Sequence, residues 1–210
     1  MAFSDAIFAI IITLLVLDLR VPDVPPGRLL SGLLAQWPSY VAYLASYSYV
    51  AVVWLNHKAA FNRIQQVDRG LHWMNLLVLF STALLPFPTA VVSRALQEHN
   101  NADQRVGIAF YALIGAVLCT TWLAFYHYLA HNPDLLKAQA KGGFFHVERF
   151  RALAGVVLYL LAGLVGYLVA PLIGLVIFVV LPVFYAITSA GLYQSRLTHR
   201  ITHRPSPPRG

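Results

Sequence analysis

The sequence is poor in charged residues and contains a single cysteine. Charged residues make up 11% of the 210 residues and hydrophobic residues 59%, whereas about a quarter of a soluble domain is charged. The mean hydropathy is +0.65. This shortage of charge predicts an all-α integral membrane protein rather than a soluble domain. Because Cys119 stands alone, an intrachain disulfide and a metal site built on several cysteines are both excluded.

The motifs of common enzyme classes are also missing. The chain has no glycine-rich phosphate loop, no Gly-x-Ser-x-Gly and no paired carboxylates within an apolar run. His127 and His131 are four residues apart, a spacing that by itself is weak support for a metal site. We therefore expect a protein that is not an enzyme and that holds no cofactor and no resident metal.

The chain is basic, with a formal net charge of +7 and an isoelectric point of about 9.8. In a soluble protein this charge would indicate nucleic acid, but in a membrane protein it reflects Lys and Arg concentrated on the cytoplasmic side. We expect no nucleic-acid partner. With six spans and a cytoplasmic N-terminus, eleven of the basic residues fall in inner segments and four in outer ones (Arg20, Arg28, Arg94 and Arg105). This bias predicts that both termini are cytoplasmic.

Six apolar segments predict six transmembrane helices in one domain, residues 1–195, followed by a basic, disordered tail at 196–210. The predicted spans are about 3–18, 38–56, 71–92, 106–129, 150–169 and 175–193. A loop rich in proline, 20–37, separates the first two. Pro86 and Pro88 predict a kink or an end of the third helix, with freed carbonyls that neighbouring helices or hydroxyls must satisfy. Pro171 to Gly174 predicts a tight turn before the sixth span.

The first apolar segment is unusually short. The residues between Asp5 and Asp18 are uncharged. At about 1.5 Å per residue they cover roughly 18 Å, against a hydrocarbon core of about 30 Å. A helix this short, with a carboxylate at each end, should lie among other helices or line water. We interpret it as the lining of an ion pore.

One face of this helix contains Ile10, Thr13, Leu14 and Leu17, at positions i, i+3, i+4 and i+7. Copies of the helix around an axis would surround a pore with apolar rings and one ring of hydroxyls. The same spacing also describes ordinary helix packing, and Thr13 could simply bond back to the carbonyl of Ala9. Periodicity leaves both interpretations open.

Polar residues gather at the predicted cytoplasmic end of this helix. Ser4 and Asp5 are suited to capping it and to facing its dipole. Alternatively, they belong to a polar network with Asn56 or His57, which the topology places on the same side of the membrane. The segment from Trp54 to His57 could equally be an interfacial anchor. Spacing does not separate these alternatives.

Three motifs resemble the transmembrane protein 175 family, the endosomal and lysosomal potassium channels and their prokaryotic relatives. They are Phe3-Ser4-Asp5 followed by Thr13-Leu14-Leu15-Val16-Leu17, then Trp54-Leu55-Asn56-His57, and finally Asn75 with Leu85-Pro86-Phe87-Pro88-Thr89. The resemblance covers about residues 3–92, and the last three spans are similar in composition only. It implies a subunit of six transmembrane helices and a homotetramer in which the first helix lines a central pore.

The resemblance also implies residue roles. The positions matched to pore constriction and selectivity are Ile10, Thr13, Leu14 and Leu17, of which Ile10 matches the constricting isoleucine. The positions matched to a polar network at the cytoplasmic pore end are Ser4, Asp5, Asn56 and His57. One family feature falls before the first residue of the sequence: the motif's arginine stands four residues before the phenylalanine, and only Met1 and Ala2 precede Phe3. Either the chain was trimmed, its start was assigned late, or this member lacks the arginine.

We therefore expect a passive, moderately K⁺-selective channel with a hydrophobic constriction on its first helix. Its partners would be copies of itself, membrane lipid and K⁺, and its location the plasma (inner) membrane of a prokaryote. Two alternatives stay open. A secondary transporter of a cation or small solute would show broken helices at matching positions of two halves, and only the proline pair in the third span suggests one. The other alternative is a structural membrane protein that conducts no ions.

Overall fold

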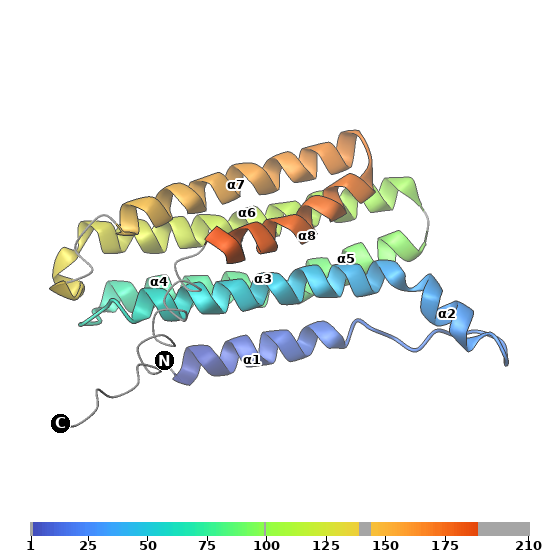
Figure 1. The fold of residues 1–210 in the computed structure, drawn as a ribbon, viewed down its shortest axis with the longest axis horizontal. Helices are drawn as coiled ribbons and strands as arrows, with labels where there is room; N and C mark the ends of the chain where they lie inside the picture. Colours follow the sequence, from blue (N-terminus) through green and yellow to red (C-terminus); the bar gives the residue numbers. More distant parts are fainter. Residues whose placement is uncertain (1, 99, 139–143, 189–210) are drawn as a thin grey trace, which may run out of the picture.

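We describe a computed structural model that covers residues 2–98, 100–138 and 144–188. Its elements are α1 (Ala2–Val16), α2 (Leu29–Ala35), α3 (Trp37–Phe61), α4 (Arg69–Ala83), α5 (Pro86–Gln97), α6 (Asn101–His131), the 3₁₀ turn η1 (Pro133–Leu135), α7 (Phe144–Leu168) and α8 (Pro171–Thr188). Figure 1 shows α1, α3, α4 with α5, α6, α7 and α8 running alternately in opposite directions. The predicted tail at 196–210 and the predicted helix end at Tyr193 lie outside the described residues.

Three segments of the described chain are long and apolar enough to cross a membrane: 69–97, Asn101–His131 and Phe144–Leu168. The helix α1 and the segment Pro171–Ile187 are apolar but shorter. The 25-residue α3 has the length, but its serines and tyrosines lower its hydropathy. The all-helical prediction is therefore confirmed, whereas six spans and a tetramer stay predictions.

Helix starts follow from local side chains. At the start of α4, the Asp68 carboxylate accepts the backbone N–H of Leu71 at 2.8 Å. At the start of α6, the Asn100 side chain accepts the N–H of Ala102 at 2.9 Å. Both residues satisfy amides that the first helical turn leaves unpaired. Pro38 stands in the first turn of α3, where its missing N–H costs nothing.

The proline pair interrupts the third predicted span, as expected: α4 ends at Ala83 and α5 begins at Pro86. The freed carbonyls are satisfied locally rather than by neighbouring helices. The Leu85 amide donates to the Thr82 carbonyl, and the Phe87 amide donates to the Leu84 carbonyl, both at 3.1 Å. These bonds reach back three residues instead of four, which tightens the turn around the break.

Two boundary predictions were wrong. The predicted loop 20–37 contains the short helix α2. Its residues, 29–35, lie after the prolines and Gly27 and are mostly apolar, so nothing in them prevents a helix. The predicted tight turn at 171–174 is instead the first turn of α8, so the connection from α7 is only Val169 and Ala170. Proline fits this position because its φ angle is already helical and its missing N–H is not needed there.

Small residues bring α6 and α7 close together. A Cβ at Gly115 of α6 would lie 2.5 Å from the ring of Tyr159, and a Cβ at Gly163 of α7 would overlap with the Cβ of Ala112. Close backbone approach of this kind replaces the hydrophobic effect as the force between helices in lipid. It makes α6 and α7 the scaffold of the second half of the chain.

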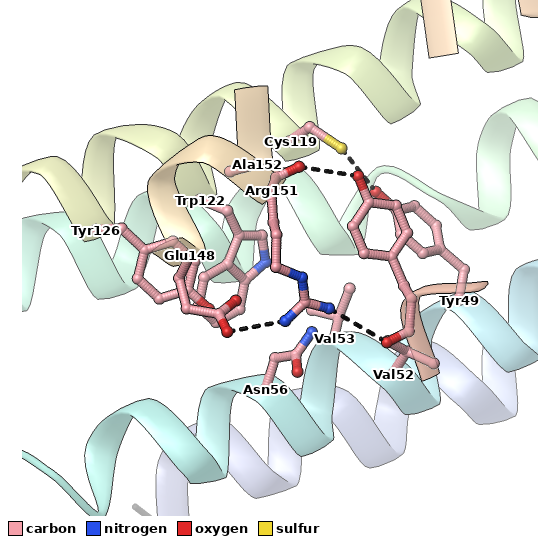
Figure 2. Close-up of a pocket in the computed structure, with 11 residues that line it drawn as sticks. Tyr49, Val52, Val53, Asn56, Cys119, Trp122, Tyr126, Glu148, Arg151 and Ala152 are labelled. Carbon is pink, nitrogen blue, oxygen red and sulfur yellow. Dashed lines mark hydrogen bonds and ion pairs between the residues drawn. The ribbon is translucent and has the colours of Figure 1, made fainter. Parts of the chain in front are cut away.

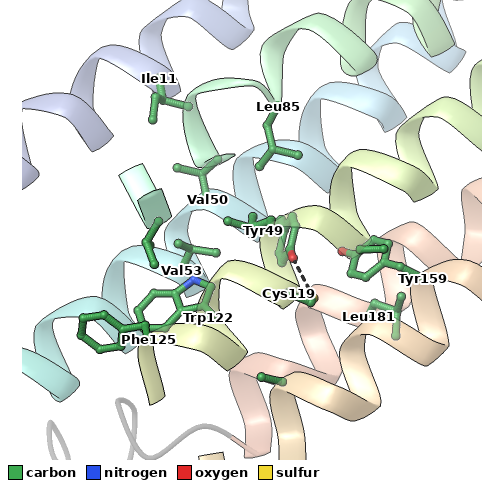
Figure 3. Close-up of a cluster of buried hydrophobic side chains, with 14 of the residues drawn as sticks. Ile11, Tyr49, Val50, Val53, Leu85, Cys119, Trp122, Phe125, Tyr159 and Leu181 are labelled. Carbon is green, nitrogen blue, oxygen red and sulfur yellow. Dashed lines mark hydrogen bonds between the residues drawn. The ribbon is translucent and has the colours of Figure 1, made fainter. Parts of the chain in front are cut away.

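A buried core joins α3 to this scaffold. Figure 3 shows the side chains of Tyr49 and Val53 of α3 among residues of α1, α6, α7 and α8. Tyr49 and Tyr159 lie with ring centroids 5.3 Å apart, and the Tyr49 hydroxyl is 3.4 Å from the Cys119 sulfur. In the same interior, the Ser46 hydroxyl bonds to the hydroxyls of Thr89 at 2.7 Å and Tyr111 at 2.9 Å. Ser46 and Tyr49 of α3 therefore face protein.

The α6–α7 contact makes a first prediction. Gly163→Ala should lower the free energy of unfolding by about 1–3 kcal/mol, because the added methyl has no room against Ala112. Gly107→Ala is the matched control, since its Cβ would lie at an ordinary 3.5 Å from Ala95. Thermal unfolding in detergent measures both variants. Equal midpoints for the two would contradict the assigned packing.

Asp68 makes a second prediction, about pH. Hydrogen bonds from the Tyr128 hydroxyl, at 2.6 Å, and from the Leu71 amide lower the pKa of this carboxyl. The carboxylate therefore stabilises the fold above the unfolded-state pKa of about 4, and this contribution is lost as the pH falls through the lower folded-state pKa. We expect Tyr128→Phe to weaken this acid dependence of the thermal midpoint. Tyr167→Phe, at an exposed tyrosine, should leave it unchanged; identical pH profiles for all three proteins would contradict the assignment.

Candidate functional site

The helix α1 has two faces with different surroundings. Its packed face, which rests on the other helices, consists of Ser4, Phe8, Ile11 and Leu15, all at most 4% exposed. Its predicted pore face consists of Ile10, Thr13, Leu14 and Leu17, all exposed, with 57% exposure at Ile10 and 68% at Leu17, which lies in the turn just after the helix. Within the chain, α1 contacts α3, α4 and α5. The spacing of the predicted pore face therefore does not reflect helix packing inside one subunit.

Thr13 lies at the middle of the predicted pore face. Its hydroxyl donates to the carbonyl of Ile10 at 2.8 Å, three residues back, and not to Ala9 as considered from the sequence. A hydroxyl has one hydrogen and two acceptor lone pairs. Because the hydrogen is committed to the backbone, the exposed oxygen can act only as an acceptor towards anything beside this face.

A polar relay fixes the beginning of α1 to α3 and α4. The His57 Nε2 atom lies 2.7 Å from Asn75 Oδ1, and Asn75 Nδ2 donates to the Ser4 hydroxyl at 3.3 Å. An amide oxygen can only accept, so His57 Nε2 is the donor in this pair. Ser4 is 4% and His57 1% exposed. Asn75 of α4 therefore links Ser4 of α1 to His57 of α3, two residues that the sequence predicted for the polar network.

A second set of contacts holds Asp5. The indole N–H of Trp54 donates to Asp5 Oδ1 at 2.8 Å, and Lys58 Nζ lies 3.8 Å from the same oxygen. The Lys58 ammonium also lies 4.6 Å from the centre of the Trp54 ring. Both charged side chains are partly exposed, so the ion pair adds little energy. The hydrogen bond from the Trp54 indole fixes the orientation of the Asp5 carboxylate. We call Ser4, Asp5, Trp54, His57, Lys58 and Asn75 the anchor cluster.

Aromatic rings enclose His57 within the anchor cluster. Phe61 stacks on the imidazole with centroids 4.4 Å apart, and Phe8 meets its edge at 5.3 Å. Trp122 of α6 approaches at 6.3 Å. This enclosure leaves the imidazole few orientations and so fixes the direction of its bond to Asn75.

Asn56, the fourth residue predicted for the polar network, lies elsewhere. It lines a cavity of about 50 Å³ between α3, α6, α7 and α8, which Figure 2 shows with Asn56 below the guanidinium of Arg151. Arg151 donates to Glu148 at 2.8 Å, and the Tyr185 hydroxyl donates to the Arg151 carbonyl at 3.0 Å. A cavity of this size holds a few water molecules at most. Successive helix residues point about 100° apart, which separates Asn56 from His57.

Sequence reasoning missed two groups that helical spacing could have indicated. Trp54 and Lys58 stand at i and i+4 on α3, which places both beside Asp5. Glu148 and Arg151 stand at i and i+3 on α7, and they form a buried ion pair. Both spacings are common on solvated helices, so neither signal identifies a buried partner by itself.

The other end of α1 opens on a larger cavity. Asp18 and Arg20 line a space of about 520 Å³ together with Gln36 and residues of α5. Elsewhere, His127 and His131 lie with ring centroids 4.2 Å apart. Within the ranges that the structure describes, no group of three or more His, Cys, Asp or Glu side chains is arranged to hold a metal ion.

A profile of the family described as the endosomal/lysosomal potassium channel TMEM175 matches residues 1–86. This range contains α1, α3, α4 and every residue of the anchor cluster. A potassium channel of Streptomyces collinus is 37% identical over 159 residues, which cover 75% of this chain and 76% of that protein. A potassium channel of Chamaesiphon minutus is 37% identical over 142 residues, which cover 66% and 68%.

Two further comparisons concern more distant relatives and the fold. The human endosomal/lysosomal proton channel TMEM175 is 28% identical over 165 residues, which cover 73% of this chain and 32% of that protein. The crystal structure of the lysosomal potassium-selective channel TMEM175 homolog from Chamaesiphon minutus superimposes with a TM-score of 0.78. It is 31% identical and covers 90% of this chain and 95% of its own. The arrangement of helices is therefore shared over nearly the whole length of both chains.

The relay predicts energetic coupling between α1 and α4. In a double-mutant cycle, Ser4→Ala and Asn75→Ala should couple by about 0.5–1.5 kcal/mol, because each removes one partner of the same hydrogen bond. Ser31→Ala is the control, since Ser31 is exposed on α2 and its hydroxyl donates to the nearby Arg28 carbonyl. Thermal or chemical unfolding in detergent gives the four energies. Additive effects in the Ser4 cycle would show that the relay does not hold α1.

Proposed function

Because this chain belongs to the TMEM175 family, whose bacterial members include named potassium channels, we propose that it is a passive potassium-permeable channel of the cell membrane. Its relatives are channels rather than enzymes, and its apolar helices agree with an integral membrane protein. The proposed assembly is a homotetramer in a prokaryotic inner membrane, with both termini in the cytoplasm. No cofactor takes part; K⁺ is the permeant ion.

The observation that supports this proposal best is the pair of faces on α1. The packed face is buried against the other helices of the chain, while Ile10, Leu14 and Leu17 remain exposed. Lipid is a poor cover for this face, because 15 residues span only about 22 Å of a core of about 30 Å. Asp5 and Asp18 would also lie within reach of acyl chains. Four copies of α1 around an axis place this face against water instead.

The proposed constriction is a ring of Ile10 side chains, followed outward by rings of Leu14 and Leu17. Apolar rings of this kind gate a pore by excluding bulk water. An ion that passes must give up part of its hydration shell. Na⁺ holds water more tightly than K⁺, so the loss is larger for Na⁺ and the narrow ring favours K⁺.

Thr13 would replace part of the lost shell. Its hydroxyl hydrogen is bonded to the Ile10 carbonyl, so the oxygen offers only lone pairs towards the axis. Four such oxygens one turn from the Ile10 ring can coordinate a cation, but they supply fewer ligands than a filter built from carbonyl rings. Selectivity is therefore moderate.

The anchor cluster would set the position of this ring. It ties the first turn of α1 to α3 and α4 through Ser4, Asp5 and their partners. A shift of α1 by a fraction of a side chain changes the diameter of a pore made of four α1 helices, so a rigid anchor defines the constriction. In this role Ser4, Asp5 and His57 position the pore helix, whereas Asn56 supports the packing of α3 on α7.

Ile10→Ala should lower the K⁺/Na⁺ permeability ratio towards unity and should increase total flux, because the narrowest ring becomes wider and wetter. The measurement is ion flux into liposomes with K⁺, Na⁺ or Cs⁺ as the only permeant cation. A further measurement with a pH-sensitive dye tests for proton flux, because the human relative is named a proton channel. Size-exclusion chromatography with light scattering checks that the tetramer stays assembled.

Val16→Ala is the matched control, since Val16 is 45% exposed on α1 but points about 120° away from Ile10. It should leave the permeability ratio unchanged. An unchanged ratio in Ile10→Ala would overturn the pore assignment. Saturable flux coupled to a second gradient would favour a transporter, and absence of any flux from the wild-type protein would favour a structural role.

A further inference from the structure

A shallow groove lies on the outer surface between α6 and α7, away from α1. Its volume is about 290 Å³, and its lining comprises Leu123 of α6 and His146, Arg149, Phe150 and Leu153 of α7. Figure 1 shows this end of α6 and α7 at the same end of the bundle as the start of α1. The groove therefore lies where the helices leave the membrane, and it combines apolar walls with a cationic rim.

The rim carries a guanidinium without a carboxylate. The ion pairs seen among the described residues include Lys58 with Asp5, Arg94 with Glu98 and Arg151 with Glu148, and none of them involves Arg149. The adjacent Glu148 is 7% exposed and faces the interior, where it accepts from Arg151. His146 is exposed one helical turn before Arg149 on α7. His127 of α6 is close enough to Arg149 to feel its charge. The rim is therefore a place for an anion.

The apolar wall continues along α7 as a stripe. Phe150 is 73% exposed, Leu153 47%, and the stripe extends through Val157, Leu160 and Leu164, each about half exposed. These positions are spaced by three or four residues, so they share one face of the helix. It contains no polar side chain, unlike the α1 face with Thr13. Acyl chains are the cover that such a face requires in a bilayer.

From this combination we infer that the α6–α7 groove is a binding site for an anionic phospholipid. The phosphate lies at Arg149 and His146, and one acyl chain follows Leu123, Leu153 and the stripe beyond them. Arg provides a planar fork of donors that matches phosphate oxygens. The proposal does not depend on ion conduction, because the groove belongs to α6 and α7 and not to α1.

Native mass spectrometry of the purified full-length protein, titrated with phosphatidylglycerol or phosphatidylcholine, tests the site. We expect phosphatidylglycerol to bind more tightly, and Arg149→Gln to weaken its binding about fivefold. Arg149→Lys keeps the charge and should retain most of the preference. Arg69→Gln is the matched control, because Arg69 is exposed at the same end of the bundle, on α4, and does not line the groove.

Three results would overturn the proposal. The first is equal binding of the two lipids by the wild-type protein. The second is an equal loss of phosphatidylglycerol binding in Arg69→Gln and Arg149→Gln, which would show that lipid binding depends on net charge alone. The third is displacement of the lipid by soluble glycerol phosphate at the same concentration, which would show that the apolar stripe adds nothing. Thermal midpoints in detergent confirm that each variant is folded.

Discussion

The structure depends on how a short helix is held at the edge of a bundle. The first helix has too few residues to cross lipid alone, and only one of its faces touches the rest of the chain. Apolar contact through Phe8, Ile11 and Leu15 has no direction along the helix axis, so it permits sliding. The hydrogen bonds from Asn75 to Ser4 and from Trp54 to Asp5 do have direction. They fix the position of α1 along its axis and its rotation. The pore proposed for the exposed face of α1 depends on that fixed position.

The two halves of the chain are built by different physical means. In the second half, glycines such as Gly115 and Gly163 let α6 and α7 approach until backbone meets side chain, which gives a contact that tolerates no added methyl. In the first half, the polar anchor cluster joins α1 to α3 and α4, and the prolines separate α4 from α5. The rigid half serves as a scaffold, and the polar half positions the helix that would line the pore.

The sequence predicted the helical class because low charge and long apolar runs leave few alternatives. Boundaries were less predictable where one residue type has two uses: Pro171 can end a turn or begin a helix, and only its neighbours in space decide. The packed face of α1 could not be derived from periodicity, since apolar residues occupy both faces. Asn56 and His57 are adjacent in the sequence, but Asn56 lines the cavity beside α7 and α8 whereas His57 bonds to Asn75 of α4. Proximity along the chain therefore does not show which polar residues bond to one another.

The exposed apolar faces of α1 and α7 differ in chemistry, and this difference distinguishes the surroundings proposed for them. The α1 face includes an acceptor hydroxyl at Thr13 and lies between two carboxylates, so it suits water and cations. The α7 stripe has no polar atom along its length and ends at an unpaired guanidinium among the described residues, so it suits acyl chains below a phosphate. Exposure alone would treat both faces alike. In the proposed channel, the sign of the charge at each end and the length of each helix would put water against the α1 face and lipid against the α7 stripe.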